Sequence, residues 1–182
     1  MKKSVLLLVF AISMTVGSCK KEQSVDNADA VTEEVVVDKV FSVVLDAVIK
    51  QDDDIALYYT TDGSTDFSKV VPIWQAVKGN PSAQQITFKL PEGTKPTEFR
   101  IDFGLKENQE DIYFNKITFS HLGAERTIAC PEMVDFFRAD DNNCSFDPAT
   151  GLIKAKIVAG KRAVPSIYPQ EKNLMPELEK LH

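Results

Sequence analysis

QQITFKL, residues 84–90, decides the fold class because its polar and apolar side chains alternate without a break from Gln85 to Leu90. Ile86, Phe88 and Leu90 fall on one face of an extended chain, and the residues between them fall on the other. A helix would need apolar residues three and four positions apart. The stretch therefore predicts a β-strand with one buried face.

Further runs of β-branched and aromatic residues follow this pattern, separated by Asp, Gly and Pro turns about every ten positions. The predicted strands cover 40–50, 55–61, 70–78, 98–103, 112–120 and 152–158, with shorter candidates at 127–129 and 133–138. The apolar residues of 112–120 fall out of phase, which predicts a β-bulge near Asn115-Lys116. We expect an all-β chain with a single antiparallel β-sandwich over residues 39–160.

Residues 161–182 contain Pro165, Pro169 and Pro176. Proline has no N–H to donate to a sheet, so these residues should stay out of any central strand. They are expected to form a C-terminal tail packed on the sandwich, with a short helix from Pro176 to Leu181.

Residues 1–18 have the order of a secretory leader. Lys2 and Lys3 precede an apolar run that is too short to span a bilayer, and small residues lead to Cys19. Val16-Gly17-Ser18-Cys19 resembles the bacterial lipobox, with Val16 where leucine is commonest. The resemblance implies cleavage before Cys19 and acylation of that residue, palmitate included. An ordinary cleaved secretion signal is the alternative.

Residues 19–38 follow as the lipidated cysteine and a polar tether without aromatic side chains, too poor in apolar surface to fold alone. The chain has 21 basic and 27 acidic residues, a balance that argues against nucleic acid and against adhesion to anionic lipid. Membrane attachment would then rest on the lipid anchor. Lys20 replaces the aspartate that retains similar lipoproteins at the inner membrane, so the outer membrane is expected, in either leaflet.

The other two cysteines, Cys130 and Cys144, would share an oxidising compartment. Disulfides persist there, so a bond between these two is expected. Two buried free thiols are the alternative.

Several strand motifs together resemble the jelly-roll modules of bacterial glycan-handling proteins, such as galactose-binding-like and carbohydrate-binding modules. They are Tyr58-Tyr59, the Trp74 strand before Gly79, residues 85–91, Phe99-Arg100-Ile101-Asp102-Phe103-Gly104 and residues 112–117. The Arg-x-Asp-x-Gly strand is frequent in such modules. The resemblance implies a jelly-roll-like sandwich that binds a glycan without catalysis.

Sugar rings stack on exposed aromatic side chains, and their hydroxyls need planar polar partners. The candidate stacking residues are Trp74, Tyr58 and Tyr113, and the candidate hydrogen-bonding residues are Arg100, Asp102 and Gln75. A core position for Trp74, and a simple surface pair of Arg100 with Asp102, are the alternatives.

Residues 58–64, YYTTDGS, also resemble a signature of small immunoglobulin-like modules attached to chitobiase-type enzymes, here interpreted as a strand followed by an Asp-Gly turn. The sequence has none of the common hydrolase, phosphate-loop or metalloprotease motifs, so no catalytic residue and no cofactor are expected. A structural calcium near Asp52-Asp53-Asp54, or near Asp140, Asp141, Asn142 and Asp147, remains the less favoured reading of the acidic turns. A structural or assembly lipoprotein that docks another envelope protein is the alternative function.

Overall fold

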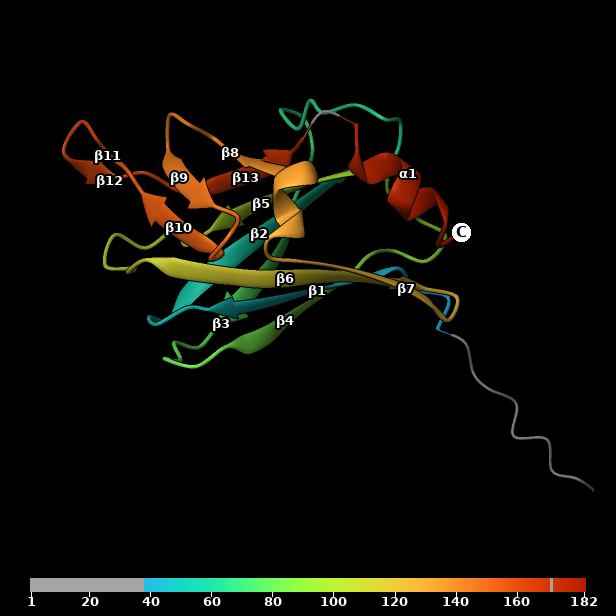
Figure 1. Ribbon diagram of the computed structural model, residues 1–182, viewed down its shortest axis with the longest axis horizontal. Helices are drawn as coiled ribbons and strands as arrows, with labels where there is room; N and C mark the ends of the chain where they lie inside the picture. Colours follow the sequence, from blue (N-terminus) through green and yellow to red (C-terminus); the bar gives the residue numbers. More distant parts are fainter. Residues whose placement is uncertain (1–37, 171) are drawn as a thin grey trace, which may run out of the picture. The chain divides into compact units, whose positions relative to one another are not determined.

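The computed structural model describes residues 38–170 and 172–182, and two antiparallel sheets dominate it (Figure 1). The first sheet has the order β4 (Gln84–Lys89), β1 (Ser42–Val48), β6 (Ile112–His121), β10 (Leu152–Ala155) and β9 (Cys144–Asp147), with β7 (Ala124–Ala129) also paired to β6. The second has the order β3 (Ile73–Val77), β2 (Asp53–Thr60), β5 (Glu98–Phe103), β13 (Ser166–Pro169) and β8 (Phe137–Ala139). The predicted all-β sandwich is confirmed.

Three small elements complete the described chain: a hairpin of β11 (Ile157–Val158) and β12 (Lys161–Arg162), a 3-10 turn η1 (Glu132–Asp135) and helix α1 (Leu174–Glu179). The predicted strand 133–138 is thus wrong in its first half. The predicted strand 152–158 breaks at Lys156, whose N–H donates to Asn143 O.

The core fills the space between the two sheets. Phe99 of β5 stacks on Phe119 of β6 with ring centroids 5.2 Å apart, and Phe103 lies at the same distance from Phe114. The alternating side chains that the sequence pattern turns inward are buried as predicted. In β1, β4 and β5 and at their ends these are Phe41, Val43, Leu45, Ala47, Ile49, Ile86, Phe88, Leu90, Phe99, Ile101 and Phe103.

The predicted bulge is present in β6. Asp46 pairs with Lys116, whereas the next residue of β1, Ala47, pairs with Phe114, so Asn115 is the extra residue. Its side-chain amide donates to Asp46 Oδ1 at 2.7 Å. The bulge restores the phase and lets both halves of β6 face the core.

The expectation that residues 161–182 avoid central strands is wrong. β13 lies between β5 and β8, and Ile167 pairs with both Ile101 and Ala139. Pro165 lies just before the strand, and Pro169 is its last residue, opposite Phe137 at the end of the ladder with β8. Pro165 still takes part through its carbonyl, which accepts from Phe103 N at 2.8 Å.

The predicted C-terminal helix is confirmed as α1, slightly earlier in the chain than expected. No helix among residues 38–170 and 172–182 is long and apolar enough to cross a membrane. The predicted leader and the tether up to residue 37 lie outside the described residues.

Candidate functional site

Four of the six predicted ligand residues share one surface, the face of the second sheet that points away from the core, here called the outer face. Trp74 pairs with Ala56, and Ala56 pairs with Asp102. Tyr58 pairs with Arg100 in the next outward row. Because directly paired residues point to the same side of a sheet, these side chains lie together.

Aromatic and guanidinium groups alternate across the outer face from β2 to β8. The guanidinium carbon of Arg100 lies 4.7 Å from the ring centroid of Tyr58 and 4.8 Å from that of Tyr168. The guanidinium carbon of Arg138, in β8, lies 5.4 Å from the ring centroid of the same Tyr168. This cation–π row ties four adjacent strands together.

Arg100 is also held by a bidentate pair with Asp102. Its Nε and Nη2 each donate to one carboxylate oxygen at 2.8 Å. Burial disfavours the charge, but the hydrogen bonds and negative charge of Asp102 outweigh it, so the pKa of Arg100 is raised. The side chains are only 22% and 8% exposed, so the pair belongs mainly to the architecture of the sheet.

Trp74 differs from this row because half of its surface, 50%, is exposed. It lies on the edge strand β3 and pairs with Ala56, whose side chain is small and buried, so no large side chain stands opposite the indole. Val71, three residues earlier, is 85% exposed. Trp74 therefore presents an aromatic surface to solvent and is not a core residue.

The other two predicted ligand residues lie elsewhere. Tyr113 is exposed between the buried Ile112 and Phe114, so it points away from the core on the first sheet. Gln75 pairs with Ile55 and points away from Trp74, at the open edge of β3. Neither residue can share a ligand with Trp74 in this arrangement.

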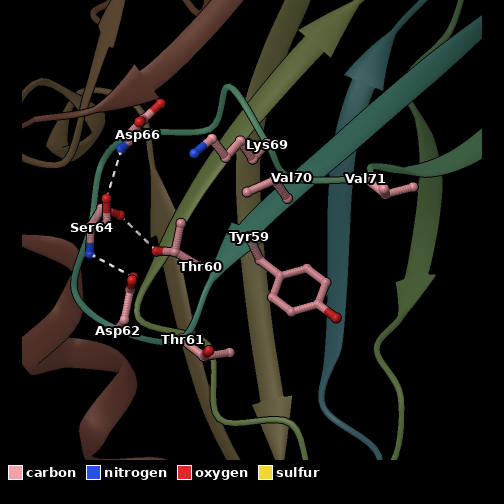
Figure 2. Close-up of a pocket in the computed structure, with 9 residues that line it drawn as sticks. All are labelled: Tyr59, Thr60, Thr61, Asp62, Ser64, Asp66, Lys69, Val70 and Val71. Carbon is pink, nitrogen blue, oxygen red and sulfur yellow. Dashed lines mark hydrogen bonds between the residues drawn. The ribbon is translucent and has the colours of Figure 1, made fainter.

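An open hollow of about 560 Å³ lies where β2 continues beyond Leu57, the partner of Ile73 at the start of β3 (Figure 2). Figure 2 shows the Tyr59 ring between Thr61 on one side and Val70 and Val71 on the other. The lining residues are Tyr59, Thr60, Thr61, Asp62, Ser64, Asp66, Lys69, Val70 and Val71. Most of these side chains carry a hydroxyl or a charge.

Hydrogen bonds between side chains and backbone shape the loop around this hollow. Ser64 N donates to Asp62 Oδ1 at 3.0 Å, and Asp66 N donates to Ser64 Oγ at 3.0 Å. Thr60 Oγ1 donates to Ser64 O at 2.7 Å (Figure 2). Such Asx and Ser turns order a polar loop without a core of its own.

Sequence reasoning missed Tyr59, Asp62, Asp66 and Lys69. Tyr59 falls on the core-facing phase of β2, but it lies beyond the last residue that β3 covers, so the ring is only half-buried. The signal that could have found it was the YYTTDGS stretch, which was interpreted only as a turn.

Several of the acidic side chains considered as calcium ligands accept hydrogen bonds from nearby backbone and side-chain groups. Asp53 does not lie in a turn but in β2, fully buried, and accepts from the backbone of Leu105 and Lys106 and from the side chain of Gln109. Asp147 accepts from Ala149 N and Thr150 Oγ1, and Asp140 from Asn142 N and Asn143 Nδ2. In the described part of the chain, no three His, Cys, Asp or Glu residues form a group suited to a metal ion.

The predicted disulfide is not formed, because Cys130 and Cys144 are both free. Cys130 Sγ lies 3.5 Å from Phe114 O, whereas Cys144 Sγ is buried 3.4 Å from Ser166 O, a carbonyl of the other sheet. The two thiols thus lie against different backbone carbonyls. The alternative of two free thiols describes this structure.

No protein-family model, curated protein or solved structure matches this chain. The function must therefore be argued from the residues of the site.

Proposed function

We propose that this chain is a non-catalytic, lipid-anchored envelope protein that binds a glycan in the hollow at Tyr59. The observation that carries the proposal is this open, polar hollow. An enclosed apolar pocket would suit a small hydrophobic molecule. An open surface with aromatic faces and many hydroxyl and carboxylate groups suits a sugar chain.

The side chains divide the work of binding. The ring of Tyr59 offers a flat apolar face on which a pyranose ring can stack. Asp62 and Asp66 each use one oxygen to order the loop, which leaves the second oxygen to accept from a sugar hydroxyl. Lys69, whose side chain points toward Asp66 in Figure 2, supplies a donor beside this carboxylate.

A glycan-array screen tests this function with the chain from Val36 onward, which contains the whole buried core. We expect Tyr59→Ala to weaken binding of any retained glycan by tenfold or more, roughly the loss of one aromatic anchor. Tyr113→Ala is the matched control, because Tyr113 is exposed on the first sheet. Binding that survives Tyr59→Ala, or no retained glycan, would rule out this site.

The anchor is proposed from the lipobox-like stretch that ends at Cys19. A diacylglycerol on the thiol and an acyl chain on the new amine together give stable attachment, here to the outer membrane. Cys19→Ser should abolish incorporation of labelled palmitate and release the protein from the membrane fraction. Labelling that persists in this variant would place the lipid elsewhere.

A second function, docking of another envelope protein, is favoured by the β11–β12 hairpin (Figure 1). Ile157 and Val158 in this hairpin are 70% and 50% exposed. Apolar side chains exposed next to one another often mark protein contacts. Ile157→Ser with Val158→Ser should remove a co-purifying envelope protein while glycan binding is unchanged, if the hairpin is that contact.

A further inference from the structure

Glu98, at the start of β5, is a completely buried carboxyl group on the outer face. Neither of its oxygens has a hydrogen-bond partner among the described residues. Buried polar groups in folded proteins are nearly always paired, because an unpaired one has lost its hydration without compensation. The position of Glu98 therefore requires an explanation.

The surrounding groups are committed to other bonds or are apolar. Thr60, directly opposite Glu98 in the β2–β5 ladder, donates its hydroxyl to Ser64 O. Helix α1 lies next to this site. Met175 Sδ is 3.5 Å from the position that a Cβ on Gly63 would occupy. Leu174, the neighbour of Met175, is completely buried. Glu98 thus lies beside the start of the C-terminal helix, where the backbone N–H of Met175 is close to its carboxyl group.

Burial raises the pKa of Glu98 from 4.5 to about 7. The ammonium group of Lys172, in the turn before α1, and the backbone N–H of Met175 oppose this shift, but neither forms a hydrogen bond with the carboxyl. The other charged groups on the elements around Glu98 are engaged elsewhere or lie in solvent. They are Arg100 (paired with Asp102), Glu177 (paired with Arg126 and Lys180), and the exposed Asp62 and Glu179.

We propose that Glu98 is a pH-dependent latch for the C-terminal helix: the protonated carboxyl allows α1 to dock on the sheet, and the carboxylate favours its release. Release of α1 would let water hydrate the carboxylate, but it would also expose Leu174 and Leu178 to solvent. Because the docked state holds its proton more tightly than the released state, docking weakens as the pH rises from 4.5 to 7. Above 7 the carboxyl is ionised in both states, and the effect no longer grows.

The far end of the helix has a contact with the opposite response. His121 Nδ1 lies 3.0 Å from Leu181 O and 3.2 Å from His182 Nδ1. Burial and the neighbouring His121 ring lower the pKa of His182 from 6.5, and a protonated His182 would oppose docking in acid. Glu98→Gln removes only the response of Glu98, so this variant separates the two effects.

Hydrogen exchange of the full chain, followed by mass spectrometry, tests the latch. After correction for the intrinsic exchange rate, peptides covering residues 174–181 should open about tenfold more at pH 8 than at pH 6, given a pKa of about 7 when docked and 4.5 when released. Peptides from β1 should show no such rise, because the core stays folded. Glu98→Gln should abolish the rise in the helix.

Glu179→Gln is the matched control, since Glu179 is an exposed carboxylate on the same helix. It should keep the tenfold rise. The proposal is overturned if the wild-type helix shows no pH dependence, or if Glu98→Gln shows the same dependence as the wild type. A direct readout avoids variants: the ¹³C chemical shift of the Glu98 carboxyl in the wild type should titrate near pH 7, and titration near 4.5 would also overturn it.

Discussion

Trp74 lies directly opposite Ala56 in the β2–β3 ladder, with the alanine completely buried and the indole half exposed. Because half of the indole is in solvent and the residue opposite it has only a methyl group, Trp74 adds little apolar surface to the core. Trp74→Ala should therefore change the free energy of unfolding by less than about 1 kcal/mol. Phe99→Ala is the buried counterpart and should cost about 3 to 5 kcal/mol in the same urea titration. A large loss for Trp74→Ala would show that the indole supports the core.

Asp102→Ala should destabilise the sheet by about 2 kcal/mol, because it leaves the poorly hydrated guanidinium of Arg100 without its bidentate partner. Lys78→Ala provides the comparison. Its pair with Asp52 joins side chains that are 90% and 54% exposed, so its loss should leave the unfolding curve nearly unchanged. Urea unfolding measures both, and equal effects would contradict the role assigned to the buried pair.

Asp53 organises the loop after β5. Its carboxylate accepts from Leu105 N at 2.8 Å, from Lys106 N at 3.2 Å and from Gln109 Nε2 at 2.9 Å. Asp53→Ala should leave these donors unpaired, cost roughly 2 to 4 kcal/mol of stability and speed amide exchange at Leu105 and Lys106. Asp54→Ala, one residue along and half-buried, should leave the exchange of those amides unchanged.

The two thiols should be chemically distinct. Cys144 is completely buried and burial raises its pKa, so it should resist alkylation in the folded protein, whereas the half-buried Cys130 should react slowly. Both should react in denaturant without any reductant. Mass spectrometry of the alkylated peptides measures this, and a linked Cys130–Cys144 peptide would refute the free-thiol structure.

Alternation predicted the strands whose two faces meet different surroundings. In β4 and β5 the side that faces the core is apolar along its whole length, so the local sequence was sufficient. It failed for Ser166–Pro169, because flanking prolines hide a strand whose position depends on β5 and β8, far away in sequence.

The candidate site was predicted in part for the same reason. Tyr58, Trp74, Arg100 and Asp102 could be placed on one face by counting alternate residues, once their strands were known to be neighbours. Tyr113 was grouped with them although it belongs to the other sheet, because periodicity does not say which strands pair. The exposure of Tyr59 depends on where β3 begins, which no local pattern shows.

The position of β13 between β5 and β8 also constrains the order of assembly. Among the described residues, β13 is the only strand of the second sheet that pairs with β8, so β8 can join the sheet only together with residues 166–169. A chain that emerges from its N-terminus must hold β5 with one open edge until this late segment arrives. The sheet is therefore closed by contacts of long sequence separation, which slow folding and keep the emerging chain incomplete until its last third is available.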